Sequence, residues 1–299
     1  MPGSRAIFLV LLLMGLLGPQ ASALRVCTLH PLLTDLAKQV GGGDVEVVSL
    51  MPAGSDPHHF SPSASQLARM SNSRIVLAMG KSLESYLPEL KDKLKQGQVI
   101  YEVGRTIPSI TVKEGPLFVC CPVHASGTID PHWWHSIRNM QRASTAVAKE
   151  FGKLDPANKG AYETRAKAYN KRLDTLRVWA GNEISKIPRS ARKLATIHAA
   201  WGYFCKEFGF KSVMVQGLNK EQKASSKHLQ ETVNDIKDQK VRALFPDETA
   251  NLSALKSIAQ QTGVKIGGKL NTNGCGTGSS GTFEGMMRHN ISTIVASLR

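Results

Sequence analysis

A long uninterrupted helix-forming stretch in the middle of the chain, from Asn158 to Ile187, most constrains how this sequence can fold. Its apolar residues recur at steps of three and four, which is the period of one buried helix face. They are Tyr162, Ala166, Tyr169, Leu173, Leu176 and Ala180. At about 1.5 Å per residue such a helix would be roughly 40 Å long, long enough to cross two lobes. Pro188 then ends it.

Short apolar runs of strand length alternate with helical stretches on both sides of this helix, for example "RIVLAMG" before it and "KLATIH" after it. Continuous apolar strands separated by helices are typical of a parallel sheet that is covered on both faces. The expected fold is therefore α/β, with two lobes, each a mostly parallel sheet flanked by helices, joined by one long rigid helix. The expected boundaries are 24–156, 157–188 and 189–299. Two further helices are expected to begin at Ser61-Pro62 and directly after Pro131.

The first 23 residues have the pattern of a secretory signal peptide. Arg5 precedes an apolar run, and Ala21-Ser22-Ala23 forms a cleavage site of the A-x-A type. The apolar run is too short to span a bilayer comfortably. Val26 before Cys27 is not the small residue expected at a lipidation site. The sequence predicts an exported, periplasmic protein without a transmembrane anchor.

The chain is strongly basic, with a formal net charge of +15 over 299 residues. Such a charge can indicate a nucleic-acid partner. The basic residues are, however, spread through amphipathic stretches, and no nucleic-acid-binding motif is present. We expect a monomer with a solvated basic surface and no nucleic-acid partner.

Five cysteines are present: Cys27, Cys120, Cys121, Cys205 and Cys275. In an exported protein they could supply one or two disulfides, with a thiol left over. The apolar run "LFVCCPV" around Cys120 and Cys121 instead favours their packing as small hydrophobic residues in a strand. The pairing stays open.

The tripeptide Asp-Pro-His occurs twice, ending at His58 and at His132, each time before an expected helix. His198 ends the apolar strand "LATI", and ligands of α/β sheets bind at the carboxyl ends of strands. Three neutral imidazoles from separate loops suit a divalent ion such as Zn²⁺. The aspartate of each tripeptide is expected to accept the ring N–H of its histidine or a nearby backbone N–H.

The other histidines have simpler interpretations. His59 is expected to point away from His58, because neighbouring side chains of an extended loop diverge. His135 lies one helical turn from His132, so it could reach the same ion or face solvent. Surface or helix-capping roles are expected for the single histidines His30, His124, His228 and His289.

Four blocks resemble the bacterial solute-binding proteins that serve as zinc and manganese receptors of ABC importers. They are "MPAGSDPHHFSPSASQLARMSNSRIVLAMGKSLESYLPEL", "DPHWWHSIRNM", "IHAAWGYFCKEFGF" and "FEGMMRHNISTIVASL". The resemblance covers essentially the whole mature chain. It implies two α/β lobes joined by a long helix, metal in the cleft between them, and delivery to an ABC importer membrane permease.

The resemblance also implies a ligand set. His58 rather than His59, then His132 and His198, match the family's ligand positions. A histidine at the third position resembles the zinc receptors, because the manganese receptors commonly have a glutamate there; Mn²⁺ is the less favoured cargo. The family's fourth ligand is an aspartate, and the matching position here is Asn273, whose side chain offers only a neutral carbonyl oxygen. Water or Glu284 are the alternatives for completing the site.

Two other functions remain as alternatives. Three histidines with an open fourth position also describe a catalytic zinc site, so a metal-dependent hydrolase is possible, with Glu248 as the nearest candidate base. An adhesin-like surface protein is the other alternative. The preferred reading is a binding protein and not an enzyme.

Overall fold

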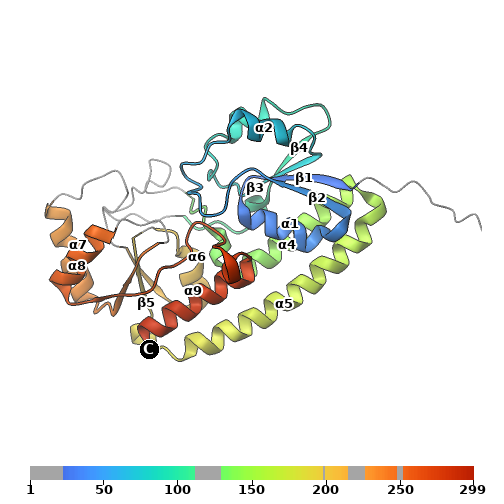
Figure 1. Cartoon of the computed structure of the whole chain (residues 1–299). Helices are drawn as coiled ribbons and strands as arrows, with labels where there is room; N and C mark the ends of the chain where they lie inside the picture. The colour runs from blue at the N-terminus through green and yellow to red at the C-terminus, as the bar shows by residue number, and fades with distance from the viewer. Residues whose placement is uncertain (1–22, 112–128, 198, 215–225, 248–251) are drawn as a thin grey trace, which may run out of the picture.

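The computed structural model describes residues 23–111, 129–197, 199–214, 226–247 and 252–299, and it contains two four-stranded parallel sheets (Figure 1). The first sheet has the order β2-β1-β3-β4, and every neighbouring pair is parallel. Its strands are β1 (Leu24–Thr28), β2 (Val45–Ser49), β3 (Ile75–Ala78) and β4 (Val99–Glu102).

The first sheet is buried on both faces, as the continuous apolar runs predict. Along β1 and β3 alternate side chains enter two different apolar clusters: Val26 and Leu77 face one, Cys27 and Val76 the other. This is the two-residue period of a strand. The surrounding helices are α1 (Pro31–Gly41), α2 (Ala64–Met70), α3 (Leu87–Lys91) and α4 (Ile137–Leu154).

The second sheet repeats the arrangement with the order β6-β5-β7-β8, again all parallel. Its strands are β5 (Lys193–Thr196), β6 (Lys211–Met214), β7 (Ala243–Phe245) and β8 (Lys265–Ile266). The helices of this lobe are α6 (Gly202–Phe208), α7 (Ser226–Asp238), α8 (Leu252–Thr262) and α9 (Phe283–Leu298).

The long helix α5 (Lys159–Ser185) runs beneath both lobes and confirms the predicted connection between them (Figure 1). It packs on α4 and α1 of the first lobe and on α9 of the second. The whole predicted apolar stripe is buried in the largest core cluster, which includes residues of both lobes. The two lobes therefore share one hydrophobic core.

Two helix starts differ from the sequence-based expectation. The helix α2 begins at Ala64 rather than at Pro62, because Ser63 and Gln66 form a reciprocal capping box. The helix α4 begins at Ile137 after a 3₁₀ turn over Trp133–His135, because the Ser136 hydroxyl caps it by accepting the Asn139 N–H. A side-chain cap within reach decides each start.

Three cysteines lie within the described residues, and all are buried free thiols: Cys27, Cys205 and Cys275. No disulfide therefore joins these three. Burial raises the pKa of Cys27 and of Cys205 to about 12, so both remain protonated and unreactive. Residues 1–22 of the expected signal segment, together with Cys120, Cys121 and His124, lie outside the described residues. Among the helices that the structure describes, none has the length and apolarity to cross a bilayer.

Candidate metal centre

Both Asp-Pro-His tripeptides fold into the same local turn. The Oδ1 atom of Asp56 accepts the backbone N–H of His58 at 3.0 Å, and Oδ1 of Asp130 accepts that of His132 at 2.9 Å. An aspartate that bonds the N–H two residues onward forms an Asx turn, and proline between them suits this geometry. The repeat is therefore a device that sets the backbone of two histidines in the same way.

Asp130 also orients the ring of His132. Its Oδ1 lies 2.8 Å from Nδ1 of His132, and both side chains are almost fully buried. Because a carboxylate only accepts, Nδ1 carries a ring proton, and in the neutral form of the ring Nε2 presents its lone pair. Gly202 at the start of α6 permits this approach, because a Cβ atom there would lie 2.6 Å from Oδ2 of Asp130.

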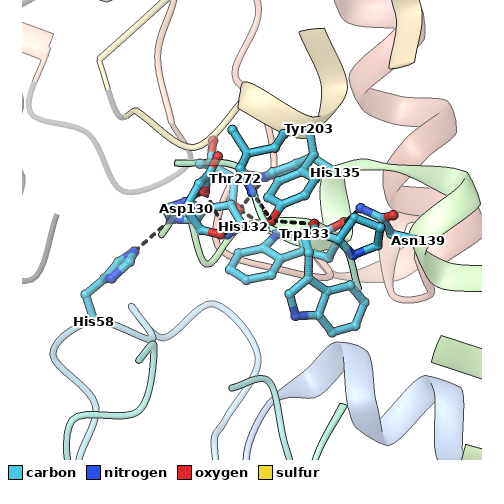
Figure 2. A network of polar contacts seen from close by, with 11 residues as sticks. His58, Asp130, His132, Trp133, His135, Asn139, Tyr203 and Thr272 are labelled. Carbon is cyan, nitrogen blue, oxygen red and sulfur yellow. Dashed lines mark hydrogen bonds and ion pairs between the residues drawn. The ribbon is translucent and has the colours of Figure 1, made fainter. Parts of the chain in front are cut away.

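His58 reaches across to His132 from the first Asp-Pro-His loop (Figure 2). The two Nε2 atoms lie 3.0 Å apart, and the ring centroids are 5.1 Å apart. Two imidazole nitrogens bound to one tetrahedral Zn²⁺ at about 2.0–2.1 Å would lie about 3.3 Å apart. The pair is thus already close to the spacing that a shared metal ion requires.

His59 points away from this pair, as expected. Its side chain is 53% exposed, and its Nδ1 lies 3.3 Å from Oδ2 of Asp56. Asp56 therefore serves two functions, because one oxygen sets the backbone of His58 and the other holds the ring of His59.

The loop that carries Asn273 is buried and is held from both lobes. From the second lobe, the Asn290 side chain pairs with both the N–H and the carbonyl of Asn271, and Asp247 accepts the Thr272 hydroxyl. From the first lobe come side chains of His30, Trp134 and His135, which bond the carbonyls of Thr272 and Asn273. Asn273 itself is 5% exposed.

The sequence did not predict that His30 and His135 would bond the carbonyls of the Asn273 loop. His30 caps α1 by accepting the Leu32 N–H, as expected, but it is buried rather than on the surface. His135 does not face solvent. Its Nε2 bonds the carbonyl of Thr272, and its ring stacks on Trp201 with ring centroids 4.1 Å apart. Burial lowers the pKa of each to about 3, so both imidazoles are neutral at physiological pH.

The described part of the chain brings together two of the predicted ligands, His58 and His132. Within those ranges no three His, Cys, Asp or Glu side chains are grouped to hold an ion. His198 and Glu248 lie outside the described residues; β5 ends shortly before His198, at Thr196. Glu284 is bound elsewhere, since its carboxylate pairs with Arg172 of α5 at 3.3 Å, which disfavours it as the fourth ligand.

Comparison with known proteins gives a match over residues 26–297 to the family model described as zinc-uptake complex component A, periplasmic. The manganese-binding lipoprotein MntA of Bacillus subtilis is 31% identical over 274 residues, which cover 89% of this chain and 87% of that protein. The zinc-binding protein TroA of Treponema pallidum is 31% identical over 283 residues, covering 91% and 88%.

Solved structures agree with the fold. The periplasmic zinc-binding protein TroA of Treponema pallidum superposes with a TM-score of 0.81 at 29% identity, covering 92% of this chain and 99% of that one. A cadmium-bound periplasmic metal-binding protein of Candidatus Liberibacter asiaticus also gives 0.81, at 23% identity and with the same coverage, and supports the fold alone. Two parallel sheets bridged by a long helix are thus an architecture found in metal-binding proteins.

Proposed function

The chain belongs to the family of the periplasmic zinc-uptake component A, and from this premise we propose that it captures Zn²⁺ outside the cytoplasm and delivers it to an ABC importer permease. The family consists of metal-binding substrate-binding proteins of ABC transporters, not of enzymes. Membership therefore gives no support to the hydrolase and adhesin alternatives.

The observation that supports metal capture most strongly is the 3.0 Å separation between Nε2 of His58 and Nε2 of His132. The two nitrogens come from separate loops, and Asp130 presets the tautomer of His132 for coordination. A shared cation and a direct hydrogen bond both suit two imidazole nitrogens at this spacing, and the cation agrees with the metal-binding family of the chain. We propose His58 and His132 as two ligands, with His198 as the third.

Zinc is proposed over manganese because of the donor types. Imidazole nitrogen suits Zn²⁺, whereas Mn²⁺ favours carboxylate and other oxygen donors. One relative named for manganese and one named for zinc are both 31% identical to this chain. Family membership therefore does not select the metal, and the choice rests on the ligands of this chain.

Asn273 is proposed as the fourth ligand, through its side-chain oxygen. It occupies a buried loop between the lobes, and the pairing of Glu284 with Arg172 leaves Asn273 the better candidate. A neutral amide oxygen binds a divalent cation more weakly than a carboxylate does. We therefore expect a site that is weaker than its Asn273→Asp variant.

Competitive zinc titration of the mature chain, from residue 24, tests the proposal. One Zn²⁺ per chain is expected, displaced poorly by excess Mn²⁺, with affinity lost in His198→Ala and raised in Asn273→Asp. The Asn273→Asp variant should also gain affinity for Mn²⁺, because it acquires a hard oxygen donor. If one Zn²⁺ per chain binds with the same affinity in both variants as in the wild type, the ligands are elsewhere.

A further inference from the structure

We propose that Trp134, His135 and His30 are positioning residues of the metal site, which hold the Asn273 loop of the second lobe against the first. This inference rests on the proposed function, because it assigns these residues a role in retaining the metal ion. None of the three is proposed to touch the ion. They act through the main chain of Thr272 and Asn273.

Three ring N–H groups converge on two consecutive carbonyls. The Thr272 carbonyl accepts a hydrogen bond from the Nε2–H of His135 at 2.9 Å and another from the Nε1–H of Trp134 at 3.1 Å. The main-chain carbonyl of Asn273 accepts a hydrogen bond from the Nε2–H of His30 at 3.0 Å. All three donors belong to the first lobe, and both acceptors belong to the second, so the contacts cross between the lobes.

The directions of these bonds follow from the chemistry of each ring. Indole nitrogen is only a donor. Nδ1 of His30 accepts the Leu32 N–H, so the proton of the neutral ring must be on Nε2, which then donates to Asn273. The rings are 0–1% exposed, so removing a donor would leave a buried carbonyl without its partner.

Trp134 connects this set of donors to a proposed ligand. Its ring meets that of His132 edge-to-face with centroids 5.1 Å apart, and it also lies 5.3 Å from the His30 ring. The loop is shaped to accept the close approach, because a Cβ atom at Gly274 would lie 2.9 Å from Cε1 of His30, and φ there is 141°. The same indole thus contacts the ring of one proposed ligand and the backbone beside another.

The test is a double-mutant cycle on zinc affinity, with unfolding of the metal-free protein measured in parallel. His135→Leu should weaken zinc binding by about tenfold, as loss of an outer partner of a metal site does. His135→Gln, which can again donate an N–H, should recover most of that loss. In the Asn273→Ala background His135→Leu should change the affinity less than about twofold, because residues that act through one another are not additive.

Trp134→Phe keeps an aromatic ring but removes the N–H together with part of the indole volume, so it is the second variant to measure if His135→Leu does not fold. Equal losses in the wild-type and Asn273→Ala backgrounds, or no rescue by His135→Gln, would overturn the positioning role. If His58→Ala leaves zinc binding intact, the proposed site itself is wrong and the positioning role fails with it. If His58→Ala abolishes binding while Asn273→Ala has no effect, only the role of the loop is refuted.

Discussion

The Nε2 atoms of His58 and His132 lie 3.0 Å apart, although the two residues are 74 positions apart in the chain. Asp130 keeps a ring proton of His132 on Nδ1, so whenever the His132 ring is neutral His58 is the donor of the hydrogen bond between the two Nε2 atoms. If the proposed site binds a metal ion, this hydrogen bond must break and the His58 proton must move to its other ring nitrogen. Under the proposed ligand set the pair is therefore preformed, and the ion would replace one hydrogen bond.

The adjacent histidines should differ sharply in their effect on metal binding. His58→Ala is expected to weaken zinc binding by more than about 100-fold, beyond the loss typical of an outer partner. His59→Ala should leave it within about twofold, because that ring lies on the surface beside Asp56. Competitive titration with a zinc chelator measures both, and similar losses in the two variants would contradict the assignment.

The two aspartates of the repeated tripeptide should also differ. Asp130→Asn is expected to weaken zinc binding by about 10- to 100-fold, because an amide orients the His132 ring less strongly and can stabilise the wrong tautomer. Asp56→Asn should cost less, since Oδ1 of Asp56 bonds the backbone N–H of His58, and the side-chain oxygen of asparagine can accept the same bond. The same titration tests this, and a larger effect at Asp56 than at Asp130 would refute it.

Local patterns of the sequence predict much of this fold. They also predict the aspartate hydrogen bonds beside His58 and His132, but not the contacts of the Asn273 loop. The continuous apolar runs identify the inner strands of both sheets, and the stripe on α5 identifies the helix that joins them. The repeated Asp-Pro-His predicts the hydrogen bonds of both aspartates. Each of these features depends on residues close together in the chain.

The roles of His30 and His135 could not be predicted in this way. Their partners are main-chain carbonyls 243 and 137 residues away, and a carbonyl leaves no mark on the sequence. The start of α4 also differs from the prediction, because the Ser136 side chain caps the helix and so sets its first residue at Ile137. Contacts between distant loops decide the roles of the two histidines, and a local side-chain cap decides the start of α4.

The buried stripe of α5 should carry the stability of the joined lobes. Leu173→Ala is expected to lower the free energy of unfolding by about 2–5 kcal/mol, because the side chain is fully buried. Val178→Ala on the same helix should change it by less than about 0.5 kcal/mol, since Val178 is 58% exposed. Denaturant unfolding of the metal-free protein compares them; equal costs would mean that α5 is not packed as described.

Acid should destabilise the metal-free protein through His135. Burial lowers the folded-state pKa of this imidazole from 6.5 to about 3, so its contribution to stability is complete above pH 6.5 and is lost as the pH falls toward 3. Between these values the loss is about 1.4 kcal/mol per pH unit. Relative to His135→Gln, which does not titrate, wild type should therefore lose about 2 kcal/mol between pH 8 and pH 5. A difference that stays constant with pH would contradict the buried, neutral state.

The most direct test of the central claim is the position of the metal ion itself. Anomalous diffraction at the zinc edge, from crystals of the zinc-loaded mature chain, locates it without reference to affinity. We expect one peak, about 2.0–2.1 Å from Nε2 of both His58 and His132. A zinc peak that lies away from this pair, or that contacts only one of the two rings, would contradict the account.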